Sequence, residues 1–455
     1  MKNKLITLVT SLVIFSLASC KKGGPAKEPG IDSAENLLTD PATGWKRVAV
    51  IPFTGLGTGS SPYNAMNAFD LEKVGDKFAV LYTQHGFEPL TRSEADHFYN
   101  VLVAPGQTNP EPVSISFGTS KNAGVNSPFT YYGQFLPGSY DPVFTGMDYT
   151  NNYIELRDAE GDTYAGAQAT NYPIFKYLPD GEFLAASIWT GHESFLWHYK
   201  NPPNPKGDFS STYRPGIIDG HRRLFNIPIK GSDGSYYEFS MTAKDGKSGF
   251  MVIRCREDRT YGANPPNYDI TDRGEISGLP AGGYDANFME LITYDYNSAS
   301  AELTFVAADY ASGAMGSDDR KNLYCFRWKQ GQLSKLWQQS LDQDVDLRNS
   351  IRVFVNKNML NEWRLRADGT FYLMSSGTAL ASSSAHTAIK LWEVNGSGIK
   401  LLSGISEAQT VQKSLTISTC RYFDGAYYAL AYPTGEYHYK LTDPHFHMEV
   451  IKLKQ

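Results

Sequence analysis

Hydrophobic and polar residues alternate in short runs along most of this chain, from Trp45 onward. The runs are rich in Tyr and Phe, and Gly, Asp, Asn and Pro separate them. A period of two with aromatic residues is typical of β-strands, and the separating residues favour turns. No stretch has the long 3.6-residue apolar period of an amphipathic helix. The pattern predicts an all-β fold of many short strands over residues 45–455.

One strand pattern, an Asp-Gly turn followed by an aromatic strand, recurs along the chain. The clearest copies are residues 180–187, 233–240, 368–375 and 424–431, and Gly75-Asp76 begins a variant. The glycines of the four copies are 53, 135 and 56 residues apart, which leaves room for a degenerate copy near Ala301. The 106 residues between Gly75 and Gly181 leave room for another near Thr130. The chain is expected to contain seven units, with a mean period of about 58 residues.

Further strands follow within each unit. Residues 322–328 turn at Gln330-Gly331 into a fourth strand, and residues 388–394 turn in the same way at Asn395. Four short strands per repeat resemble the blades of a β-propeller, so we predict a seven-bladed propeller. The resemblance is architectural, because the chain lacks the Trp-Asp dipeptides of WD40 blades and the double glycines of kelch blades. Two β-sandwich domains are the alternative, since Asp-Gly hairpins occur in any antiparallel sheet.

The two ends of this strand-rich region predict how the ring closes. Residues 447–454 resemble a third strand with no fourth strand after them. The run at residues 46–53 is strand-like and has no partner within its own unit. Pairing these two runs would complete the last blade and remove an exposed sheet edge.

The first twenty residues have the layout of a secretory signal. Lys2 and Lys4 precede a 13-residue apolar stretch, which is too short to span a bilayer. The stretch ends at Leu17-Ala18-Ser19-Cys20, which resembles the lipobox of bacterial lipoproteins. The resemblance implies a signal peptide at residues 1–19, lipid attachment at Cys20, and a protein of the cell envelope held at the outer membrane. Residues 20–44, rich in Gly and Pro, are expected to form a flexible tether before the body at residues 45–455.

The charge of the chain argues against some partners. The formal net charge is −6, and loss of Lys2 and Lys4 makes it −8. Such a chain is not suited to track a phosphate backbone, so we expect no nucleic-acid partner. The membrane is expected as a partner through the lipid anchor, and whether the protein faces the periplasm or the exterior stays open.

The sequence does not match the familiar catalytic and metal-binding motifs. Besides Cys20, the cysteines are Cys255, Cys325 and Cys420, and their number leaves at least one thiol unpaired. Two of them lie in strand-like runs, which favours buried, inert thiols. No C-x-x-C, Gly-x-Ser-x-Gly or His-Glu-x-x-His motif is present. We therefore expect no metal and no cofactor.

Four histidines recur at equivalent positions of the repeat, and aromatic residues that are expected to be exposed cluster in one segment. His97, His192, His386 and His445 each precede an expected third strand, which would place them at one end of the ring. Structural capping of a strand end is the favoured interpretation, with a ligand-facing role as the alternative. Tyr131 and Tyr132 lie in an irregular aromatic segment and are the other candidates for ligand contact. No residue can be assigned a catalytic role from the sequence.

Two functions fit these observations. The first is a membrane-anchored, extracytoplasmic binding or scaffold module for an envelope protein or glycan. The second is a glycan-active hydrolase or lyase on a propeller, whose catalytic side chains would come from different blades. The fold supports both, so the sequence leaves open whether the protein is an enzyme.

Overall fold

The structure is a computed structural model of the 455-residue chain. It describes residues 37–38, 41–52, 65–88, 93–115, 129–135, 138–148, 153–157, 163–168, 174–177, 183–189, 193–199, 209–256, 268–277, 279, 289–309, 322–341, 365–366, 368–374, 389–405, 415–433 and 447–453.

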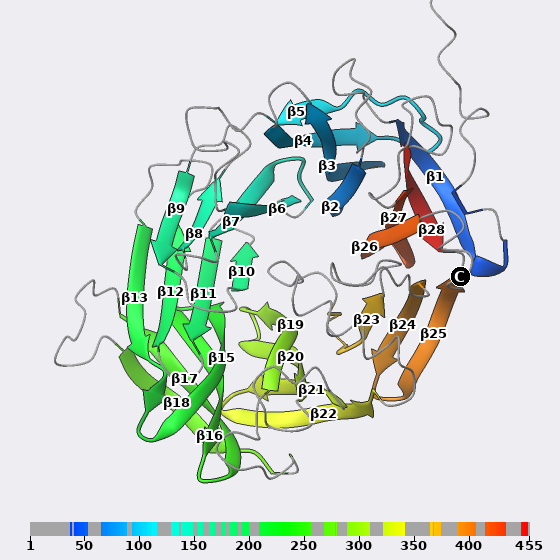
Figure 1. Ribbon diagram of the computed structural model, residues 1–455. Helices are drawn as coiled ribbons and strands as arrows, with labels where there is room; N and C mark the ends of the chain where they lie inside the picture. The colour runs from blue at the N-terminus through cyan, green and yellow to red at the C-terminus, as the bar shows by residue number, and fades with distance from the viewer. Residues whose placement is uncertain are drawn as a thin grey trace, which may run out of the picture.

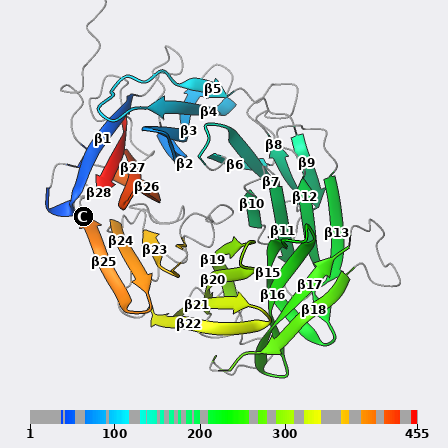
Figure 2. The same ribbon diagram turned by 180° about the vertical axis from the view of Figure 1, so that it is seen from behind.

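The described strands form seven antiparallel sheets, arranged as a ring around a central axis (Figures 1 and 2). We number these sheets blades 1 to 7 along the chain. Blade 1 contains β2 (Ala65–Val74), β3 (Lys77–Glu88), β4 (Ser93–Val103) and β5 (Val113–Ile115). Blade 2 contains β6 (Phe129–Phe135), β7 (Pro142–Asp148), β8 (Tyr153–Arg157) and β9 (Thr163–Gln168). Blade 3 contains β10 (Ile174–Tyr177), β11 (Phe183–Trp189), β12 (Glu193–Tyr199) and β13 (Phe209–Pro215).

The remaining blades follow in the same direction around the ring. Blade 4 contains β14 (Ile217–Ile218), β15 (His221–Lys230), β16 (Tyr236–Lys244), β17 (Lys247–Cys255) and β18 (Tyr268–Glu275). Blade 5 contains β19 (Met289–Asn297), β20 (Glu302–Asp309), β21 (Asn322–Lys329) and β22 (Gln332–Ser340). Blade 6 contains β23 (Phe371–Met374), β24 (Ile389–Asn395) and β25 (Gly398–Ile405). Blade 7 contains β26 (Leu415–Phe423), β27 (Ala426–Pro433), β28 (His447–Leu453) and β1 (Trp45–Pro52).

The seven-unit prediction is confirmed, and the two-sandwich alternative is wrong. Gly75, Gly234, Gly369 and Gly425 have φ between 63° and 80° and lie in the turns just before β3, β16, β23 and β27. This is the left-handed region, which glycine enters without steric cost. The degenerate copy near Ala301 is present as β20, whereas the run near Thr130 forms β6, which is the first strand of blade 2 and precedes its first turn. Among the described residues, a positive-φ glycine turn before an apolar strand therefore recurs in blades 1, 4, 6 and 7.

The first and last described strands pair, as predicted. β1 and β28 are antiparallel, with Trp45 opposite Leu453 and Pro52 opposite His447. Ile51 of β1 is fully buried in a cluster that also contains residues of blade 1. The outer strand of blade 7 thus comes from the opposite end of the chain, and Figure 1 shows β1 beside β28.

The segment before β1 also packs on the ring. Leu37 is buried, and its backbone N–H donates to Oε1 of Glu449 in β28 at 3.1 Å. After the short 3₁₀ turn η2 (Pro41–Thr43), the carbonyl of Thr43 accepts a hydrogen bond from Ser403 of β25. These contacts join blades 6 and 7, so part of the sequence expected to form the tether belongs to the folded body.

Three blades meet at one buried carboxylate. Asp70 of β2 accepts a hydrogen bond from Nη2 of Arg421 in β26 at 2.6 Å. Its second oxygen accepts from the backbone N–H of Phe135 in β6 at 2.8 Å. Asp70 and Arg421 are both buried, so the ion pair is screened weakly by water. Asp70 therefore links blades 7, 1 and 2.

Glu72, two residues along β2, makes the stability of this region depend on pH. Burial raises the pKa of Glu72 above its ordinary value, and repulsion from Asp70 raises it further. Because the pKa of Glu72 is raised in the folded state, its contribution to the free energy of unfolding is fully present below its ordinary pKa. That contribution is lost as the pH rises through the pKa of the folded state. We expect Glu72→Gln to gain stability relative to the wild type as pH rises from 4 to 7. Urea unfolding at several pH values measures this, and the same pH trend in exposed Glu111→Gln would contradict it.

Candidate functional site

Most side chains that the sequence suggested for ligand contact lie outside the described part of the chain. This holds for Cys20, His192, His386 and His445. The strands β12, β24 and β28 begin just after His192, His386 and His445, as predicted, although β24 is the second of the three strands described in blade 6. Tyr131 and Tyr132 lie in β6, where the structure describes the backbone but not these side chains.

The expected position of His97 is wrong by a few residues. His97 lies inside β4, opposite Gln84 of β3, and does not precede the third strand. The hairpin between β3 and β4 pairs from Glu88 and Ser93 onward. Backbone hydrogen bonds therefore extend the strand through polar residues that the apolar pattern assigned to a loop. The described residues contain no group of three or more His, Cys, Asp and Glu side chains that could hold a metal ion.

His447 shows the structural role that the sequence favoured for strand-end histidines. It is the first residue of β28 and is buried, and its Nε2 lies 3.0 Å from Oε1 of Glu449. The same oxygen accepts from Leu37 and lies 3.5 Å from Nη1 of Arg47. This histidine therefore stabilises the packing of the amino-terminal segment on blade 7.

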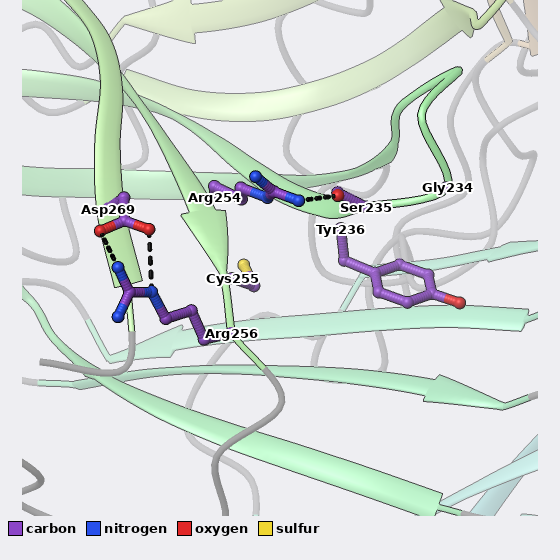
Figure 3. A pocket seen from close by; sticks show the side chains of 7 residues that line it. All are labelled: Gly234, Ser235, Tyr236, Arg254, Cys255, Arg256 and Asp269. Carbon is purple, nitrogen blue, oxygen red and sulfur yellow. Dashed lines mark hydrogen bonds and ion pairs between the residues drawn. The ribbon is translucent and has the colours of Figure 1, made fainter.

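The structure contains a pocket that sequence reasoning missed, at one end of blade 4. It has a volume of about 460 Å³ and is lined by Gly234, Ser235, Tyr236, Arg254, Cys255, Arg256 and Asp269 (Figure 3). These residues come from the turn between β15 and β16, the end of β17 and the start of β18. In an antiparallel blade these two turns share one end. The pocket therefore lies at the opposite end of blade 4 from the turn between β16 and β17, which is the turn that corresponds to those to which the histidines were assigned.

Strand pairing assembles the pocket from three segments. Tyr236 lies opposite Cys255 and Arg254 lies opposite Asp269. Arg254 and Arg256 are two residues apart at the end of an apolar strand, a spacing that places side chains on one face of a strand. In the sequence, the run Arg254-Cys255-Arg256 was the only feature that could have pointed to this pocket. The strand pairing that brings Ser235 and Asp269 beside this run joins residues that are well separated in the sequence.

The two arginines of the pocket have different partners. Arg256 donates from Nε and Nη2 to the two oxygens of Asp269, at 2.9 and 2.6 Å. Arg254 donates from Nη2 to Oγ of Ser235 at 2.6 Å and lies 4.0 Å from the carboxylate of Asp233. Both guanidinium groups are about half exposed, so they are accessible to a ligand in solution.

Cys255, between the two arginines, is a buried free thiol. Burial raises its pKa to about 12, so the thiol stays protonated near neutral pH. Cys325 is also buried, with its pKa raised to about 12 by burial, and Cys420 is buried too. The prediction of buried thiols is confirmed, and the raised pKa of Cys255 and Cys325 disfavours the thiolate, which is the reactive form.

A buried ionic cluster lies next to the pocket, between blades 3 and 4. Glu238 of β16 accepts from Nη1 of Arg214 in β13 at 2.9 Å and pairs with Arg223 of β15. All three side chains are fully buried. Arg223 also donates to Ser240 and Asn226, at 2.9 and 2.8 Å. These bonds link β13, β15 and β16 beside the pocket.

No family model matches the chain, and no curated protein matches it. Solved structures give distant similarities. The polysaccharide lyase Uly1 is 9% identical, with a TM-score of 0.40 over 88% of this chain and 91% of that chain. Pyrococcus horikoshii acylaminoacyl peptidase is 8% identical, with a TM-score of 0.40 over 84% of this chain and 53% of the peptidase. A member of the DUF4221 family from Bacteroides vulgatus is 10% identical, with a TM-score of 0.32 over 90% of this chain and 98% of that chain.

Among the described residues, no helix is long and apolar enough to cross a membrane.

Proposed function

We propose that this chain is a lipid-anchored, extracytoplasmic binding module that holds a glycan or protein of the cell envelope. The observation that carries the proposal is the pocket on blade 4, where two half-exposed arginines stand beside a hydroxyl and a carboxylate. A small number of fixed polar groups in a concave site is typical of ligand binding. The lipobox-like sequence at Leu17–Cys20 supports attachment to a membrane.

The packing of Leu37 limits how far the ring would stand from the anchor. Residues 21–36 separate Cys20 from Leu37. Fully extended, they would span about 60 Å at most, at 3.3 to 3.6 Å per residue. In this proposal the ring stays within about that distance of the membrane, where envelope glycans and proteins are concentrated.

Removal of the lipidation site tests the anchor. We expect Cys20→Ala to abolish labelling with palmitate and to release the protein from the membrane fraction, because no other thiol follows a signal-like segment. Cys325→Ala is the matched control, since it removes a buried thiol of the body and should keep both the label and the membrane fraction. A Cys20→Ala protein that still carries lipid and sediments with membranes would contradict the anchor.

A glycan array followed by a product assay separates binding from catalysis. The purified protein is applied to the array, and each bound glycan is then incubated with it and analysed for shorter or unsaturated products. A binding module retains its ligand unchanged. Cleavage of a bound glycan would overturn the proposal in favour of a glycan-active enzyme.

A further inference from the structure

We infer that the pocket on blade 4 binds a uronic-acid unit of an acidic polysaccharide, with Arg254 holding the sugar carboxylate. The inference rests on the proposed binding function and names its ligand class. It follows from the donors, acceptors and lining of the pocket.

Arg254 supplies unused donors. A guanidinium carries five N–H donors in a planar fork. Among the described residues, the one hydrogen bond of this guanidinium is the bond from Nη2 to Ser235. Asp233, at 4.0 Å, is too far away for a hydrogen bond. The remaining N–H groups lie in a half-exposed side chain on the pocket wall, and a planar carboxylate is the group that such a fork binds by two parallel bonds.

Asp269 supplies acceptors beside those donors. Each of its oxygens accepts one bond from Arg256, and a carboxylate has about four lone-pair sites in total. The remaining sites suit sugar hydroxyl groups, which donate hydrogen bonds. A ligand with both a carboxylate and adjacent hydroxyl groups therefore matches the wall better than a simple anion.

The lining favours a sugar over a peptide. Arg254, Arg256, Asp269 and Ser235 make most of the lining polar, and the other side chains that line it, Tyr236 and Cys255, are buried. Peptides are usually anchored by apolar or aromatic side chains inserted into apolar pockets. The volume of about 460 Å³ lies within the range of small-molecule sites. A pyranose ring with a carboxylate fits these features.

Binding to polysaccharide probes tests the inference. The probes are polygalacturonate, alginate and hyaluronate, with dextran as a neutral control and poly-glutamate as an acidic peptide control. We expect at least one uronate polymer to bind, and Arg254→Gln to weaken that binding at least tenfold. Arg273→Gln is the matched variant, because Arg273 is a half-exposed arginine of blade 4 that pairs with Asp219, outside the pocket. It should bind as the wild type does.

The outcomes separate the inference from the proposed function. Unchanged binding by a folded Arg254→Gln protein, equal binding of dextran or poly-glutamate, or no binding of any uronate polymer would each overturn the uronate assignment. A different glycan bound without cleavage would still support a binding module. Cleavage of a uronate polymer that depends on Arg254 would keep the ligand assignment and overturn the binding-only function.

Discussion

Deleting residues 45–53 is expected to remove the cooperative folding of blade 7. The deletion removes β1, whose buried side chains include Trp45, Ala49, Val50 and Ile51. Full burial of a large apolar side chain contributes about 1.5–3 kcal/mol, so the loss is on the order of 5–10 kcal/mol. This is comparable to the whole stability of a typical domain. It also exposes the edge of β28, which becomes available for pairing with other chains.

Hydrogen exchange and thermal unfolding measure this effect. The amides of residues 447–453 should lose protection in the deletion variant, and soluble yield should fall. Ile51→Ala is a milder variant, with an expected loss of about 2–5 kcal/mol because Ile51 is fully buried. Lys46→Ala is the control, since exposed Lys46 lies on the same strand and should change stability by less than about 0.5 kcal/mol. Unchanged protection of β28 after the deletion would show that β1 does not stabilise the blade.

The repeat of the fold was predictable because its signals are local. A glycine such as Gly425 must adopt positive φ in a short turn, and the aromatic strand after it alternates between two faces. Closure was predictable for a related reason, because one strand-like run at each end lacked a partner.

The features that were not predicted depend on partners far away in the sequence. Leu37 belongs to a segment of tether-like composition, and its hydrogen-bond partner Glu449 is 412 residues away. The short strand β14 pairs only at Ile217 and Ile218, too briefly to leave an apolar period. Arg214 has an ordinary polar neighbourhood in the sequence, and only the packing of blades 3 and 4 buries it against Glu238.

The candidate site also shows this difference between features with local sequence signals and features that depend on distant partners. The sequence pointed to histidines at turns between second and third strands, where the repeat gives a clear position. The pocket instead depends on a turn, a strand end and a strand start that meet through the pairs Tyr236–Cys255 and Arg254–Asp269. Single residues such as Ser235 and Asp269 carry no signal until that pairing is known.

Replacing Glu238 with alanine is expected to cost about 3–5 kcal/mol of unfolding free energy. Its carboxylate pairs with Arg214 and Arg223, and all three side chains are fully buried. Removing one partner of a buried ion pair leaves uncompensated charge in a medium that solvates it poorly, which is the origin of this magnitude. Here two guanidinium groups would lose their shared counter-ion, and the strands that carry the pocket would lose their common link.

Urea unfolding of matched variants isolates the effect of burial. Glu275→Ala removes a carboxylate of the same blade, but Glu275 is exposed and pairs with exposed Lys247. Exposed pairs contribute at most about 1 kcal/mol, so this variant should stay close to the wild type. Glu238→Gln keeps a hydrogen-bond acceptor and removes the charge, and it should fall between Glu238→Ala and the wild type. If Glu238→Ala and Glu275→Ala have equal stability, the buried cluster does not hold blades 3 and 4 together. If Glu238→Ala is strongly destabilised and the uronate probes also bind it more weakly, the cluster is also the support that positions Arg254 and Asp269.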